Sequence, residues 1–185
     1  MRVSMSSSVI DVRIWRTQKE MMAYLERCKR HLVLGNRGKD EGAISLAYSS
    51  GLLSTNQPKL GVGIIAVDTG FEPQTIVLEE AGILLVGFEQ ELVAIDIAWA
   101  KIRFRIGFDT CFREMIYSEP VGILAFEDFG VSAISVEGEK RWTFTKDVLT
   151  NMKLDNQNLH LEFMDSPPVV VNVESGNVLT DSSRR

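Results

Sequence analysis

Few residues in this sequence are of the kinds that carry out chemistry. The chain of 185 residues has two histidines, His31 and His160, and two cysteines, Cys28 and Cys111. Thiolates and imidazoles are the usual ligands of structural zinc, but the spacing of these four residues matches no zinc pattern. No serine lies in the Gly-x-Ser-x-Gly turn of hydrolases. We therefore expect no catalytic residue, no metal site and no cofactor, and we expect both cysteines to serve in packing.

A glycine-rich stretch at residues 35–42 could be mistaken for a phosphate-binding loop. It contains Gly-Lys, but it has neither the four-residue spacing before this pair nor the Ser or Thr that should follow it. We therefore expect a solvated connector in this stretch.

Carboxylates are the more numerous candidates for a site. Five of them fall in equivalent turns of a repeated pattern described below: Glu89, Glu91, Glu127, Asp128 and Asp165. If the copies stack, these turns should gather at one edge and form an acidic rim that could accept a cation or a basic partner. The alternative is that each charge is simply solvated.

Two large aromatic residues also fall in expected turns, where bulky apolar side chains are seldom needed. Trp99 lies in Ala98-Trp99-Ala100, and Phe129 follows Asp128. Interface cores are enriched in such residues. The alternative is that either ring folds back over a strand and covers the end of the domain. We take Trp99, Phe129, Asp128, Glu89 and Asp165 as the candidate partner-binding residues.

The turns are placed by a unit that occurs three times within residues 76–181. Residues 79–84 and 119–124 share four of six identities at an offset of 40, and residues 92–97 align with 131–136 at an offset of 39. A third copy runs from residue 152 to residue 176. Periods of this length are typical of solenoids, propellers and arrays, in which one unit cannot bury its apolar face alone.

Each copy has the pattern of short antiparallel strands. In the first copy we expect strands over residues 75–78, 83–88, 92–97 and 101–108, and turns of Gly, Glu and Asp separate the corresponding runs in the later copies. Residues 82–87 are apolar throughout, as in a strand that is covered on both faces. Residues 102–106 alternate instead, with Arg103 and Arg105 on a solvated face.

Four short strands in about 40 residues is the content of one propeller blade. The runs Ala94-Ile95-Asp96 and Ala133-Ile134-Ser135, the glycine turns that follow them and Trp142 resemble bacterial propeller repeats of the pyrroloquinoline-quinone type. The resemblance implies architecture, and no quinone site is carried over. The sequence predicts a mainly β fold of repeated antiparallel β-meanders with one N-terminal α-helix. The copies could be propeller-like blades, or they could form stacked sheets or a sandwich.

The N-terminal region should contribute one strand and one helix within residues 9–34 of a single domain. Residues 9–15 alternate as a half-buried strand, which we expect to pair with the third copy. Thr17 and Glu20 form a capping-box pattern, and Cys28 and Leu32 continue a helical apolar stripe that ends at Gly35. The meanders should fill residues 42–180, and we expect a disordered tail at residues 181–185.

Composition limits the function. The net charge of −5 and pI near 5.1 give no electrostatic reason to expect nucleic acid or a membrane surface. Two cysteines fit a reducing cytoplasm, and no apolar run is long enough to span a membrane. We expect a non-catalytic protein-interaction module, for example one with an immunity-like or antitoxin-like role, and a basic protein as its partner. The alternative is a propeller-like domain that binds a small molecule or an ion.

Overall fold

The protein is described by a computed structural model that covers residues 8–35, 43–50, 57–65 and 72–181. The chain divides into two compact units. Unit 1 comprises Met1–Phe71 with the turn segments Glu79–Ile83 and Ile95–Ile102, and unit 2 comprises Glu72–Leu78, Leu84–Ala94 and Arg103–Arg185. Residues 35–42, which could be mistaken for a phosphate-binding loop, lie mostly outside the described ranges, as does most of the tail expected at residues 181–185.

The described strands form four four-stranded sheets. The N-terminal sheet has the order β1-β3-β4-β2, and its strands are β1 (Ser8–Trp15), β2 (His31–Gly35), β3 (Ala43–Ser50) and β4 (Leu60–Ile65). The next sheet is a meander of β5 (Gln74–Leu78), β6 (Ile83–Phe88), β7 (Glu91–Asp96) and β8 (Lys101–Gly107). The third contains β9 (Phe112–Ser118), β10 (Gly122–Glu127), β11 (Gly130–Ile134) and β12 (Lys140–Thr145). The last contains β13 (Leu149–Asp155), β14 (Asn158–Phe163), β15 (Val169–Asn172) and β16 (Val178–Asp181). The expected mainly β architecture of repeated meanders is confirmed.

The N-terminal region differs from expectation in two respects. Strand β1 pairs with β3, with Val12 opposite Leu46, so its expected pairing with the third copy is wrong. Helix α1 (Gln18–Leu25) begins where expected, and the Thr17 hydroxyl accepts a hydrogen bond from the Glu20 N–H at 3.2 Å. It ends at Leu25 and does not continue to Gly35, because the chain then pairs as β2 in parallel with β4.

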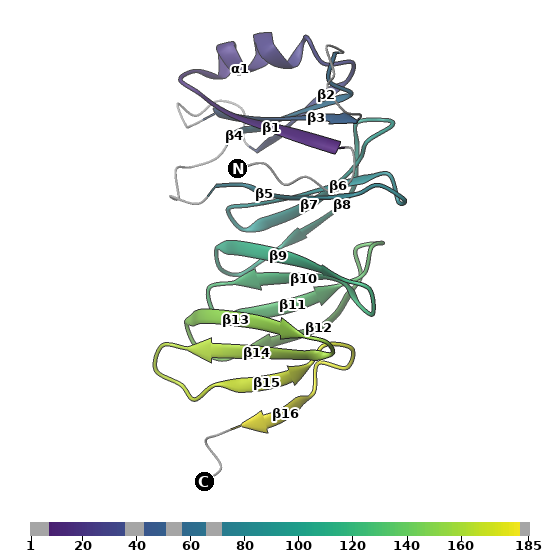
Figure 1. Cartoon of the computed structure of the whole chain (residues 1–185). Helices are drawn as coiled ribbons and strands as arrows, with labels where there is room; N and C mark the ends of the chain where they lie inside the picture. Colours follow the sequence, from purple (N-terminus) through teal and green to yellow (C-terminus); the bar gives the residue numbers. More distant parts are fainter. Residues whose placement is uncertain (1–7, 36–42, 51–56, 66–71, 182–185) are drawn as a thin grey trace. The chain divides into compact units, whose positions relative to one another are not determined.

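Helix α1 lies across one face of the N-terminal sheet (Figure 1). Its fully buried residues Met21 and Leu25 rest on two glycines of β4, Gly61 and Gly63. A Cβ added to Gly63 would lie 2.8 Å from a methyl carbon of Leu25. The two glycines therefore allow the helix to approach the sheet closely. Cys28 lies beside Gly61, and its burial there raises the pKa of the Cys28 thiol.

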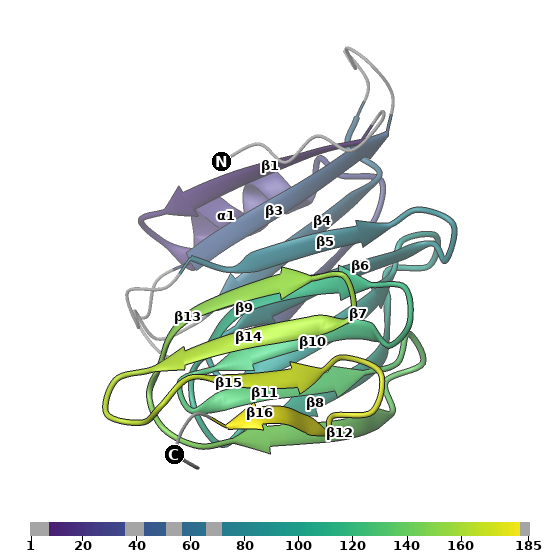
Figure 2. The same ribbon diagram turned by 60° about the horizontal axis from the view of Figure 1, so that its bottom comes forward.

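Within unit 2 the last two sheets lie one over the other (Figure 2) and share a hydrophobic core. Strands β10 and β11 are buried along their whole length, as expected for strands covered on both faces. Strand β14 alternates: Leu159, Leu161 and Phe163 face the core, whereas His160 and Glu162 are exposed. On β14 the face that points away from this core is therefore polar, as in a terminal repeat of an array.

A left-handed residue recurs every 38 positions in the turn before the fourth strand. Ala100, Gly138 and Gly176 have φ of 52°, 93° and 73°. Phe104 covers Gly138, and Trp142 covers Gly176, where an added Cβ would lie 2.6 Å from Cγ of the indole. Trp142 also donates its indole N–H to the Val173 carbonyl at 2.9 Å. The aromatic residue of one sheet thus anchors the glycine turn of the next.

Candidate functional site

Four of the five candidate residues lie at one end of their sheets, in turns that join the second strand to the third. Glu89 lies between β6 and β7, Asp128 and Phe129 lie between β10 and β11, and Asp165 lies between β14 and β15. We call the three turns, together with the connecting segments 108–111 and 146–148, the turn edge. All of it belongs to unit 2.

Backbone hydrogen bonds hold the turn edge together in a repeated pattern. The Glu89 carbonyl accepts from the N–H of Phe112 at 2.6 Å, and the Asp128 carbonyl accepts from the N–H of Leu149 at 2.7 Å. In each case the donor is the first residue of the next sheet. The backbone carbonyls of Glu89 and Asp128 therefore join successive sheets, and the side chains of these two residues lie at the turn edge.

Segment 146–148 brings the last two turns together. The Lys146 N–H donates to the Phe129 carbonyl at 3.0 Å, and the Met164 N–H donates to the Val148 carbonyl at 2.9 Å. The Lys146 ammonium also donates to the Pro167 carbonyl at 3.2 Å. Phe129 and Asp165 are thus placed on the two sides of one short segment.

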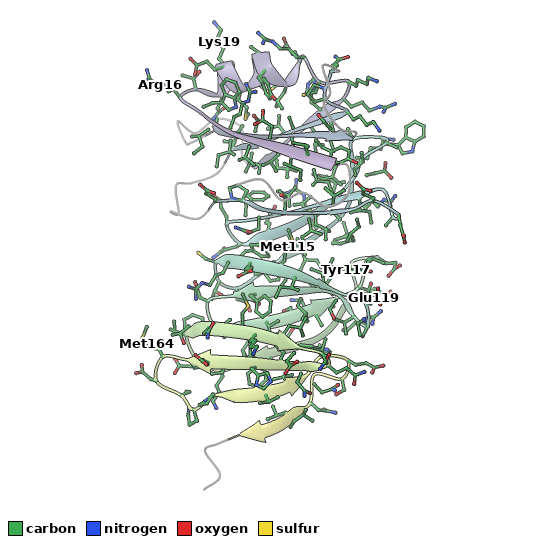
Figure 3. The ribbon with its side chains drawn as sticks, viewed as in Figure 1. Arg16, Lys19, Met115, Tyr117, Glu119 and Met164 are labelled. Carbon is green, nitrogen blue, oxygen red and sulfur yellow. The ribbon has the colours of Figure 1, made fainter. Side chains whose placement is uncertain are left out.

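Exposed apolar side chains are present at this edge. Phe129 is 43% exposed, and Met164, which the sequence analysis did not single out, is 63% exposed. Met164 projects from its end of unit 2, whereas Tyr117 and Glu119 lie at the other end (Figure 3). The signal in the sequence was its position directly after Phe163, because Phe163, like Phe88, is a buried phenylalanine that ends the second strand of its sheet, and Met164 therefore begins the turn.

The carboxylates of the edge are less uniform than a rim of free charges. Glu127 is buried and accepts a hydrogen bond from the Thr110 hydroxyl at 3.2 Å, which is a correction to its expected exposure. Glu91 pairs with Arg105 at 2.9 Å. Asp128 lies 3.9 Å from Arg113, a contact that contributes little at this exposure. Asp165 remains exposed beside Met164.

One further carboxylate at the edge, Asp147, was also missed. It accepts hydrogen bonds from the N–H of Val148 at 2.7 Å and from the N–H of Asp165 at 3.2 Å. The bond from Val148, followed by one from Ser166, lowers its pKa below the usual value of 3.8. Asp147 is therefore ionised at neutral pH and fixes the turn that carries Asp165.

Trp99 is not part of the turn edge. It lies between β7 and β8, and successive turns of a meander fall at opposite ends of the sheet, so Trp99 is at the far end of β7 from Glu89. Trp99 is 68% exposed. The Arg30 guanidinium lies 5.9 Å from the ring centroid, and the backbone N–H of Trp99 donates to the Asp96 carboxylate at 2.9 Å. The five candidates thus form one group of four and one separate residue.

Among the residues that the structure describes, no three His, Cys, Asp or Glu side chains are arranged to hold a metal ion. Cys28 and Cys111 are both free thiols. No helix in the described ranges has the length and apolar character needed to cross a membrane.

Neither a known family model nor any curated protein matches the sequence. The structure is similar to the computationally designed Ika8 protein, with a TM-score of 0.54 and 10% identity over 81% of this chain and 48% of that one. It is also similar to the dihydro-heme d1 dehydrogenase NirN in complex with DHE, with a TM-score of 0.53 and 13% identity over 75% of this chain and 32% of that one. BamB from Moraxella catarrhalis gives a TM-score of 0.48 and 9% identity, with 75% and 41% of the two chains covered.

This chain spans less than half the length of each of these three proteins. At such low identities the likeness concerns the fold alone. Ika8 and NirN are β-propeller proteins, and the four-strand meanders described above have the content of propeller blades. The chain accordingly has a propeller-like fold.

Proposed function

We propose that this chain is a non-catalytic module that binds another protein through the turn edge. The observation that carries the proposal is the pair of exposed apolar side chains, Phe129 and Met164, held on either side of segment 146–148. Apolar anchors surrounded by polar groups are the usual anatomy of an interface. Asp128 and Asp165 flank them and favour a partner with a basic surface.

A role as an immunity or antitoxin protein is the specific form of the proposal. It is supported by profile alone: the chain is small and acidic, and it lacks the motifs of known catalytic sites. A cytoplasmic location belongs to the same proposal, since both cysteines are free. Membership of the pyrroloquinoline-quinone type of propeller repeat is likewise an inference, supported by the contact of Trp142 with Gly176.

The test begins with capture of partners from the native host on the immobilised chain, followed by identification by mass spectrometry. Binding of the purified partner is then measured by calorimetry for Phe129→Ala and Met164→Ala. Truncating a central interface anchor typically weakens binding by ~1 kcal/mol or more, so each variant should bind about tenfold more weakly or worse. Asp128→Asn and Asp165→Asn should reduce the salt dependence of association.

Two control variants locate the binding surface. Tyr117→Ala removes an exposed aromatic ring at the other end of unit 2, and Trp99→Ala removes the exposed indole that lies apart from the turn edge. Both should bind the partner as the native chain does. Weaker binding in the controls but not in Phe129→Ala and Met164→Ala would contradict the assignment to the turn edge. Calorimetric titration with metal ions and metabolites tests the alternative of small-molecule or ion binding.

A further inference from the structure

Strand β1 is an edge strand with exposed apolar side chains. In the described part of the chain it pairs with β3 on one side, and its other side has no strand partner. Ile14 is 74% exposed and Val12 is 38% exposed. An edge of this kind is a template for the addition of another strand, because its outward backbone N–H and C=O groups have no ladder partner.

The sequence of β1 is complementary to itself about Val12. Asp11 and Arg13 lie one residue on either side of Val12, and Ile10 and Ile14 lie two residues on either side. We propose that β1 pairs with β1 of a second copy of this chain, antiparallel, with the two-fold axis passing beside Val12. Closed two-fold symmetry is the commonest arrangement of homo-oligomers.

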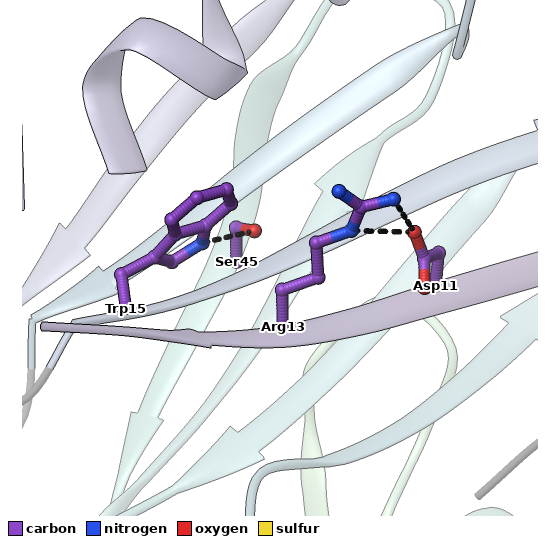
Figure 4. A network of polar contacts seen from close by, with 4 residues as sticks. All are labelled: Asp11, Arg13, Trp15 and Ser45. Carbon is purple, nitrogen blue, oxygen red and sulfur yellow. Dashed lines mark hydrogen bonds and ion pairs between the residues drawn. The ribbon is translucent and has the colours of Figure 1, made fainter. Parts of the chain in front are cut away.

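The two faces of β1 fit this register. Asp11, Arg13 and Trp15 are on the face that carries α1, where the Trp15 indole donates to Ser45 at 2.8 Å (Figure 4). The Arg13 guanidinium lies 4.6 Å from the ring centroid of Tyr24 in this helix. Ile10, Val12 and Ile14 are on the opposite face, because strand side chains alternate. Pairing about Val12 sets Ile10 against the partner's Ile14, which extends an apolar row across both copies.

The charges of Asp11 and Arg13 favour pairing about Val12 over pairing that is shifted by two residues. Asp11 and Arg13 already form an ion pair at 2.8 Å within the strand, and both side chains are about half exposed. Pairing about Val12 places each of them opposite the residue of opposite charge in the second copy. A shift by two residues would place Asp11 opposite the partner's Asp11, or Arg13 opposite the partner's Arg13, and a parallel in-register pairing would do both. Like charges directly opposite each other are unfavourable in a sheet.

Charge exchange tests both the pairing and its direction. In Asp11→Arg chains two arginines face two arginines, and in Arg13→Asp chains two aspartates face two aspartates, so neither should pair with itself. Mixed in equal amounts, however, the two variants place every arginine opposite an aspartate. Sedimentation velocity should show a dimer for the native chain, dimerisation about tenfold weaker or worse for each variant alone, and a restored dimer for the mixture.

A monomeric native chain at all concentrations would overturn the proposal, as would single variants that both dimerise as tightly as the native chain, or a mixture that dimerises no more tightly than the single variants. Circular dichroism checks that the variants are folded. Should either variant unfold, Val12→Lys keeps the Asp11–Arg13 pair and places two ammonium groups together at the axis, which should abolish the dimer. The matched control is Val178→Lys on the edge strand β16, which should leave the dimer intact.

Discussion

Replacing Trp142 by phenylalanine tests how successive sheets of unit 2 are fastened. The indole N–H donates to the carbonyl of Val173, a buried residue, at 2.9 Å. Phenylalanine has no donor, so the substitution leaves this carbonyl without its partner, which costs about 1–3 kcal/mol. Loss of the ring contact itself should be small, because the equivalent residue Phe104 covers Gly138 in the same way. We expect unfolding to require about 2 kcal/mol less free energy.

Urea denaturation followed by circular dichroism measures this change. The midpoint should fall with no change in the denaturant slope, and the melting temperature should fall by about 4–8 °C in a chain of this size. Trp99→Phe is the matched control, because Trp99 is 68% exposed and phenylalanine keeps an aromatic ring there; it should change stability by less than about 0.5 kcal/mol. A loss below about 0.5 kcal/mol for Trp142→Phe would show that the indole hydrogen bond does not fasten the sheets.

Four further substitutions test other features of the structure. Gly138→Ala should destabilise the fold by at least ~1–2 kcal/mol in chemical denaturation, because φ is 93° and the new Cβ would lie 2.5 Å from the Phe104 ring. Ala100→Gly at the equivalent left-handed position should raise the melting temperature or leave it unchanged, and a clear loss would refute the account of this position. Thr17→Ala should cost about 0.5–2 kcal/mol by removing the cap of α1, and Thr17→Ser should retain most of it. The pKa of Asp147 is lowered by folding, so its stabilising contribution is present above the ordinary value of 3.8 and is lost as pH falls towards the folded pKa; stability should fall less steeply below about pH 5 in Asp147→Asn than in the native chain.

The repeated strands were predictable because their signal is local. Strand β6 begins at Ile83 and ends at Phe88 as expected, since an unbroken apolar run bounded by Gly82 and Glu89 has few other ways to bury itself. The polar face of β14 was also legible, in the alternation of this strand.

The N-terminal errors have a common cause. Leu32 continues the helical spacing of Leu25 and Cys28, but the Arg30 carbonyl accepts from Gly61 at 2.9 Å and the chain enters parallel pairing with β4. A parallel partner about 30 residues away leaves no mark on the local pattern. The pairing of β1 with β3 is likewise a contact between segments that are far apart in the sequence. The separation of Trp99 from Glu89, by contrast, could have been obtained by counting strands, because alternate turns of a meander lie at opposite ends.

The exposed polar residues on β14 restrict how this protein could be lengthened by gene duplication. An extra module copied from the third repeat would bring Glu162 into the contact with its neighbour. Burial of this carboxylate, which accepts a hydrogen bond from the neutral Asn151 amide but has no cationic partner among the described residues, costs several kcal/mol. A module copied from the sheet of β9 to β12, whose strands β10 and β11 are buried along their whole length, would keep the 38-residue spacing of the left-handed turns and offer apolar surfaces on both sides. Natural or engineered relatives of greater length should therefore contain additional copies of the interior repeat and a single repeat with a polar outer face at the end.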